Sequence, residues 1–188
     1  MSSRRTPAES RSEANEAAAT WWQANENGIS LVDGAHHNRI GGSRPGDRNV
    51  VSANRNAGVA VENGAFDNVI AGNHLGTDSR GVEAPGPQLF GIQVRSADNQ
   101  VGGYGAGEGN LASGNQIQGI SLLGAGATRN VVAGNWAGLD ATGEKALSNG
   151  LDGISLEGGS AANRVEGNVA VSLARMAIML SDWGTSFN

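Results

Sequence analysis

Cysteine is absent from this chain, and aromatic residues are scarce. Without cysteine, neither disulfide bonds nor thiolate metal sites can hold the fold together. Aromatic residues make up only 4% of the 188 residues, which leaves the core to Ile, Val, Leu and Ala. Stability must therefore come from the stacking of aliphatic side chains.

An excess of positive charge and long apolar runs are also missing. The formal net charge of -5 argues against nucleic acid as a partner, because proteins that bind phosphate backbones usually carry a basic face. No stretch approaches the roughly 18 apolar residues of a membrane span. Residues 1–22 lack the apolar run of about 7 to 15 residues that a secretory signal peptide needs, so we expect no signal peptide in this chain.

Glycine is abundant, and it marks an internal repeat. The chain has 30 glycines without the strict three-residue period of collagen, which indicates many repeated turns. A short motif of the type Gly-Ile-x-Leu recurs at irregular, coil-sized intervals, which is typical of a solenoid. Its copies are GISL at Gly28, GVAV at Gly58, GIQV at Gly91, GISL at Gly119, GISL at Gly153 and AIML at Ala177.

Each copy alternates apolar and variable residues with a period of two, which predicts a β-strand with one buried face. The period and the flanking Gly and Asn exclude a helix. The inward pairs are Ile29 and Leu31, Val59 and Val61, Ile92 and Val94, Ile120 and Leu122, Ile154 and Leu156, and Ile178 and Leu180. The residues expected to point outward between them are Ser30, Ala60, Gln93, Ser121, Ser155 and Met179.

An asparagine follows each of these glycines after about ten residues, and most of these asparagines open a second short strand. Asparagine tolerates the left-handed backbone conformation and suits a sharp corner. In stacked coils, about 4.8 Å apart, its amide can donate to the next in a ladder. The predicted structural ladder comprises Asn38, Asn68, Asn99, Asn130 and Asn163, with Asn188 as a further copy.

The third segment of each coil alternates between two kinds. One kind passes through a glycine-rich turn and resumes at Asn49 or Asn110, whereas the other follows Asn73 or Asn135 with a longer excursion. Two coil types therefore alternate along the chain.

Four motifs in combination resemble the right-handed parallel β-helix repeats of the pectin-lyase-like superfamily, especially those of large, repetitive bacterial exported proteins. The motifs are GI-x-L, N-x-I-GG, N-x-x-SGN and GN-x-x-GTD-x-x-G. The likeness covers roughly residues 21–188. It implies right-handed coiling and a secreted or cell-surface location. It says little about function, because one fold hosts many activities.

The predicted fold class is therefore all-β, a right-handed parallel β-helix of about six coils over residues 21–188. Trp21 and Trp22 align with a third strand, so we expect the solenoid to begin part-way through a coil. Residues 1–20 are either a tail or a short capping helix, with helix formers over residues 7–19. We expect an end that is open at the C-terminal side, around Ile178 and Leu180, and self-association through open coil ends.

The outward positions of the first strands are candidates for a glycan-facing surface. In lyases of the resembled superfamily, this face carries a carboxylate cluster for Ca²⁺ and a base. Here Leu123 interrupts the outward column, so we predict no catalytic residue. That column comprises Val32, Glu62, Arg95, Leu123, Glu157 and Ser181. Glu62 and Arg95 lie on adjacent coils and could pair. The candidate glycan-facing residues are Glu62, Gln93, Arg95, Ser121 and Glu157.

Metal sites have weak support. Asp67 and Asp98 should stack one coil apart, where they could recruit Ca²⁺ or be neutralised by Arg129. His36, His37 and His74 show no spacing typical of zinc or copper ligands.

Three glycine-rich segments are interpreted as turns. GGYGAGEGN, which begins at Gly102, has glycine at the position where a Ca²⁺-binding nonapeptide repeat needs Asp. Asp78 and Asp140 each lie three residues before a glycine, which is the pattern of a type I turn.

The preferred hypothesis is a non-catalytic β-helix segment of a bacterial surface or secreted protein, a fragment that serves as a stalk or a glycan-facing adhesion surface without a resident cofactor. The alternative is a polysaccharide lyase, hydrolase or epimerase whose active face is incomplete. A dense cluster of Asp, Arg, Lys or His on adjacent coils would favour the enzyme, and the sequence does not predict one.

Overall fold

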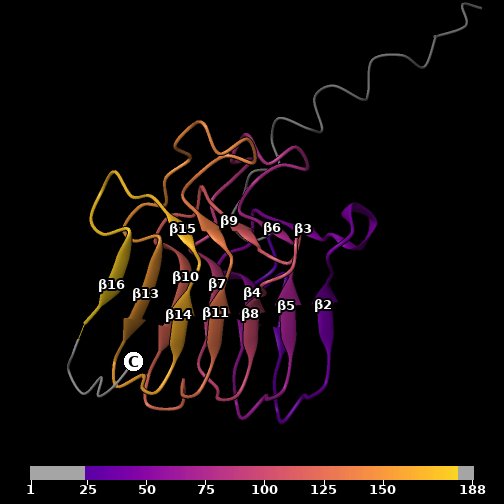
Figure 1. Ribbon diagram of the computed structural model, residues 1–188, viewed down its shortest axis with the longest axis vertical. Helices are drawn as coiled ribbons and strands as arrows, with labels where there is room; N and C mark the ends of the chain where they lie inside the picture. Colours follow the sequence, from indigo (N-terminus) through magenta and orange to yellow (C-terminus); the bar gives the residue numbers. More distant parts are fainter. Residues whose placement is uncertain (1–23, 182–188) are drawn as a thin grey trace, which may run out of the picture.

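Alternating apolar residues form a strand in every coil, and successive coils pair in parallel. The computed structural model describes residues 24–181. All six copies of the Gly-Ile-x-Leu motif enter one parallel sheet, here the first sheet (Figure 1). Its strands are β1 (Ile29–Leu31), β4 (Ala57–Val61), β7 (Phe90–Val94), β10 (Gln118–Leu123), β13 (Ile154–Glu157) and β16 (Ile178–Leu180).

Two further parallel sheets of five strands each complete the solenoid. The second sheet comprises β2 (Arg39–Gly41), β5 (Val69–Ala71), β8 (Gln100–Gly102), β11 (Val131–Ala133) and β14 (Arg164–Glu166). The third comprises β3 (Val50–Val51), β6 (His74–Leu75), β9 (Leu111–Ala112), β12 (Trp136–Ala137) and β15 (Val169–Ala170). Each turn of the solenoid contributes one strand to each of the three sheets in the same order (Figure 1). The solenoid has about five turns.

This architecture confirms the predicted all-β parallel solenoid. The described residues include a single 3₁₀ turn, η2 (Pro45–Asp47), and no helix among them is long and apolar enough to cross a membrane. The helix considered for residues 7–19, the strand at Trp21 and Trp22, and the ladder position Asn188 lie outside the described residues.

The core consists of the predicted inward side chains. Ile120 pairs in register with Ile92 on one side and Ile154 on the other, and all three side chains are completely buried. Burying one such side chain stabilises the fold by roughly 1.5 to 3 kcal/mol. The last described strand differs, because Ile178 is 42% exposed and Leu180 is 60% exposed.

The residues between these core positions are less accessible than the alternation predicts. Ala60, Gln93, Ser121 and Ser155 were expected to point outward, yet each is at most 1% exposed. Larger side chains surround this column: Phe90, Gln118 and Arg175 line a cleft together with Ser121. These positions of the central coils are therefore closed to solvent.

The predicted asparagine ladder is confirmed between the first and second sheets. Asn68 Nδ2 donates to Asn99 Oδ1 at 3.0 Å, and the same side chain donates to the Ala35 carbonyl of the preceding coil at 2.8 Å. The amides of Asn38, Asn68, Asn99, Asn130 and Asn163 are joined in this way from coil to coil. Each ladder amide therefore satisfies backbone groups that the corner would otherwise leave buried and unpaired.

The left-handed backbone conformation lies one residue earlier than the sequence indicates. The residue with positive φ is the one before each ladder asparagine, with φ of 52° at Asp67, 59° at Asp98 and 54° at Arg129. Tolerance of this conformation is therefore not the reason for asparagine at the corner. The reason is the amide, which links adjacent coils.

Two more amide ladders hold the other corners, and the sequence analysis did not identify them. The second joins Asn49, Asn73, Asn110, Asn135 and Asn168 between the second and third sheets. The third joins Asn54, Gln88, Asn115 and Asn149 where the chain returns to the first sheet. The repeated Gly-Asn pairs in the sequence are the signal that would have found the second ladder.

A candidate binding groove on the third sheet

The third sheet presents a column of bulky and varied residues on its outer face. Its strands have two residues each, and the second residue of the central strands, such as Leu75 or Ala112, is buried in the core. The first residue consequently points outward. Strand register aligns these first residues as Val50, His74, Leu111, Trp136 and Val169.

The chain makes a longer connection after β6 and another after β12, and these two excursions cover part of the column. Each begins with a predicted aspartate turn, at Asp78 in the first excursion and at Asp140 in the second. Asp78 Oδ1 accepts hydrogen bonds from the backbone N–H groups of Val82 at 2.9 Å and Glu83 at 3.2 Å. The Val82 N–H is the largest of the influences that lower the pKa of Asp78 to about 2. In both turns the glycine N–H bonds back to the aspartate carbonyl at 3.0 Å, as a type I turn requires.

The second excursion is built in the same way around Asp140. Its Oδ1 accepts a hydrogen bond from the Thr142 hydroxyl at 2.7 Å, which is the main reason that the pKa of Asp140 is lowered. The Ala141 N–H donates to the Gly81 carbonyl of the first excursion at 2.8 Å. The two excursions thus contact each other although a coil without an excursion lies between them.

The excursions pack directly on the outer column. A Cβ atom on Gly81 would lie 2.7 Å from Leu111 Cδ2 and 2.9 Å from His74 Cε1. A Cβ atom on Gly143 would lie 3.0 Å from the Trp136 ring. Glycine suits both positions, because φ is positive, 72° at Gly81 and 75° at Gly143, and because the loop backbone touches these side chains.

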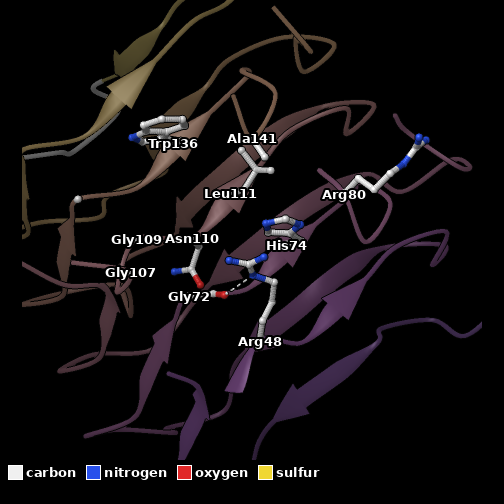
Figure 2. Close-up of a pocket in the computed structure, with 11 residues that line it drawn as sticks. Arg48, Gly72, His74, Arg80, Gly107, Gly109, Asn110, Leu111, Trp136 and Ala141 are labelled. Carbon is white, nitrogen blue, oxygen red and sulfur yellow. Dashed lines mark hydrogen bonds between the residues drawn. The ribbon is translucent and has the colours of Figure 1, made fainter. Parts of the chain in front are cut away.

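A hollow of about 410 Å³ remains open beside this column, and it is here named the third-sheet groove (Figure 2). Its glycine-rich wall includes Gly72, where a Cβ atom would lie 1.9 Å from the Gly42 carbonyl oxygen. Trp136 is 36% exposed at one end of the groove. The lining residues are Arg48, Gly72, His74, Arg80, Gly107, Gly109, Asn110, Leu111, Gly134, Trp136 and Ala141.

The groove contains one arginine whose charge is not neutralised by an acid. Figure 2 shows the Arg48 guanidinium beside the His74 ring, where its Nε donates to the Gly72 carbonyl at 3.4 Å. The ion pairs among the described residues do not include Arg48. Arg80 instead extends away from the other groove residues and pairs with Asp78 at 2.9 Å.

His74 lies under the excursion with only 5% of its surface exposed. Burial lowers the pKa of its imidazole, and the nearby charge of Arg48 lowers it further. The Asp78 carbonyl, 3.4 Å from Nδ1, acts in the opposite direction and favours a proton on that nitrogen. His74 is therefore neutral at pH 7, since its pKa is below the ordinary value of 6.5.

The residues predicted to face a glycan do not form one open site. Gln93 and Ser121 are buried, whereas Arg95 is exposed and Glu62 is partly exposed. Glu62 and Arg95 could have paired from adjacent coils, but the ion pairs formed within residues 24–181 include none between them.

Ser121 and Glu157 line a smaller cleft of about 210 Å³ on the first sheet. There Gln118 Nε2 donates to Glu157 Oε1 at 2.6 Å. Arg175 extends over the same cleft and binds Asp152 at 2.6 Å. The polar groups of this cleft are therefore largely engaged with one another.

Asp67 and Asp98 lie on adjacent coils, as expected, at the corner between the first and second sheets. Arg129 binds Asp98 through two hydrogen bonds of 2.8 and 2.6 Å, and His37 Nε2 lies 3.8 Å from Asp67. Within residues 24–181 there is no group of three or more His, Cys, Asp or Glu residues that could hold a metal ion. In this arrangement a neighbouring basic side chain relieves the repulsion at Asp98.

Sequence reasoning missed Arg48, Trp136 and the role of His74. His74 and Trp136 both follow a Gly-Asn pair in the coils that carry excursions, so an alignment of the third strands would have placed them in one column. Comparison of the chain with protein-family models, curated proteins and solved structures found no match in any of the three. The solenoid agrees with the β-helix part of the resemblance.

Proposed function

We propose that this chain is a non-catalytic structural solenoid of a bacterial surface or secreted protein, and that it holds a carbohydrate chain in the third-sheet groove. The observation that carries the proposal is the partly exposed Trp136 in the same groove as Arg48. An indole ring offers a flat apolar face with a polar N–H at its edge, which suits the mixed surface of a sugar. Ligand sites typically combine such apolar walls with a few placed polar groups.

The composition of the groove favours binding over hydrolysis. Glycoside hydrolysis ordinarily needs a pair of carboxyl groups on either side of the scissile bond. The groove is lined by arginine, histidine, glycine, asparagine and apolar residues, with no Asp or Glu among them. A hydrolase or an epimerase therefore has no specific observation in its favour.

One observation keeps a lyase as the second candidate. A neutral His74 beside Arg48 combines a proton acceptor with a cation, and β-elimination from an acidic sugar uses both. Incubation with uronate polymers, followed at the ultraviolet absorbance of unsaturated products, tests this candidate. We expect no product. Product that disappears in His74→Gln would establish the lyase instead.

Binding is tested by titration calorimetry against a panel of neutral and acidic oligosaccharides. We expect at least one to bind, and Trp136→Ala to weaken it about tenfold or more, because the aromatic face is lost. Phe66→Ala is the matched control, since Phe66 is 38% exposed but lies in a different corner, stacked on His36. The proposal fails if no oligosaccharide binds, or if Trp136→Ala and Phe66→Ala bind equally well.

A further inference from the structure

We infer that the third-sheet groove selects saccharides that carry a negative group, a carboxylate or a sulfate, which Arg48 binds while a sugar ring farther along the chain rests on Trp136. This inference rests on the proposed function and adds the class of ligand. The ligand would lie across the strands, along the solenoid axis.

The charge of Arg48 is the first argument. Within residues 24–181, five arginines pair with a carboxylate; Arg44, Arg48 and Arg95 are not among them, and of these three only Arg48 lines the groove. The five pairs are Arg39 with Glu108, Arg80 with Asp78, Arg129 with Asp98, Arg164 with Glu166 and Arg175 with Asp152. Among the residues that the structure describes, the side chain of Arg48 bonds only to the Gly72 carbonyl, through Nε, so its terminal N–H groups are available there for a bidentate bond to an anion.

The surroundings of Arg48 also favour an anion. No carboxylate lines the groove, and His74 beside it carries no negative charge. Glu108, in the neighbouring loop, is held by Arg39 at 3.7 Å and by the Gly105 N–H at 3.0 Å. An incoming carboxylate or sulfate therefore meets a single cation without an adjacent repelling acid in the groove wall.

Strand spacing sets the size of the ligand. Arg48 lies beside His74, and Trp136 lies two coils farther along the third sheet, with Leu111 between them. Parallel strands are about 4.8 Å apart, so the anion position and the indole ring are separated by about 10 Å. One sugar ring does not bridge this distance. The ligand is consequently an oligosaccharide.

Matched ligands test the inference. Two pairs of ligands are titrated into the protein at low salt. The first pair is cellouronate oligomers and their methyl esters, and the second is dextran sulfate oligomers and unsulfated dextran oligomers. We expect the charged member of at least one pair to bind about tenfold more tightly than its neutral partner, because a charge-assisted bond to Arg48 is lost in the neutral one. The two pairs separate carboxylate from sulfate recognition.

Two variants locate the effect. Arg48→Gln should reduce the preference for the charged ligand to less than about twofold while weak binding through Trp136 persists. Arg44→Gln, which changes an exposed arginine just before the 3₁₀ turn η2, should leave the preference unchanged. Both positions are exposed, so the fold is expected to tolerate both changes, which circular dichroism can check.

The outcomes separate the two proposals. Binding without preference for charge in either pair overturns this inference and leaves the proposed function standing. A preference that survives Arg48→Gln, or that disappears in Arg44→Gln, also overturns it. Absence of binding to every oligosaccharide overturns both.

Discussion

The first and third sheets belong to the same coils, yet their outer faces differ. On the first sheet the central outward residues are small or polar, and the column of Ala60, Gln93, Ser121 and Ser155 is closed to solvent. On the third sheet the column contains His74, Leu111 and Trp136, which differ from coil to coil and lie beside an open groove. Positions that carry similar residues in every coil form the closed face of the first sheet. Positions that differ from coil to coil line the third-sheet groove.

The two faces differ because their strands lead into different connections. Most first-sheet strands lead into a short turn that recurs in each coil, such as the one with positive φ at Asp33 and Gly34 and again at Asn63 and Gly64. The third-sheet strands lead into excursions in alternate coils, which meet through Ala141 and Gly81. Between them these loops cover Leu111 of the coil that lacks an excursion, which is only 5% exposed.

The amide ladders are common to both faces, so breaking one should have the largest effect on the whole solenoid. Asn99→Ala removes the donor to the Ala65 and Ala97 carbonyls and the acceptor of the Asn68 N–H. Each buried group left without a partner costs about 1 to 3 kcal/mol, so we expect a loss of about 4 kcal/mol in the free energy of unfolding. Urea denaturation followed by circular dichroism measures it.

Asn38→Ala is the control for this change, because Asn38 belongs to the same ladder but lies exposed in the first coil. Its loss should be about 1 kcal/mol or less. Equal losses at the two positions would contradict the role assigned to the buried part of the ladder.

The inward side of the first sheet gives the next largest effect. Ile120→Ala should cost about 2 to 5 kcal/mol, because the side chain is completely buried between Ile92 and Ile154 and its removal leaves a cavity. Ile178→Ala, at the same position of the last described strand but 42% exposed, should cost distinctly less. A mild effect at Ile120 would mean that the coils repack freely, which close packing of the core does not allow.

The smallest expected effect concerns the third sheet and depends on pH. The pKa of His74 is lowered in the folded protein by burial and by Arg48, whereas in the unfolded chain it returns to about 6.5. As the pH falls below that value, the unfolded state takes up a proton that the folded state does not. The free energy of unfolding should therefore fall over this window.

His74→Gln removes this contribution, so the stability difference between wild type and variant should change in favour of the variant between about pH 8 and pH 5.5. Urea titrations of both proteins at the two pH values measure the change. Parallel shifts in the two proteins would show that His74 protonates equally well in both states, and hence that it is not shielded in the groove.

Local pattern was sufficient for most of the fold. Alternation at Ile120 and Leu122 predicts an inward-facing strand, the spacing of Asn68 and Asn99 predicts a ladder, and Asp78 before Gly81 predicts a turn. Each of these features depends on residues within one coil or on identical residues in successive coils. The closed outer column around Gln93 could not be predicted in the same way, because its burial depends on neighbours from several coils.

The sequence by itself determined the solenoid, its core and the first ladder, since period-two alternation and recurrent asparagines act through contacts that repeat with every coil. Only the tertiary structure decided where a ligand could bind. Arg48, His74 and Trp136 are far apart along the chain and belong to no common motif. They meet because parallel stacking brings successive third strands within about 4.8 Å of each other and because the glycines that precede these strands, such as Gly72 and Gly109, leave a hollow beside them.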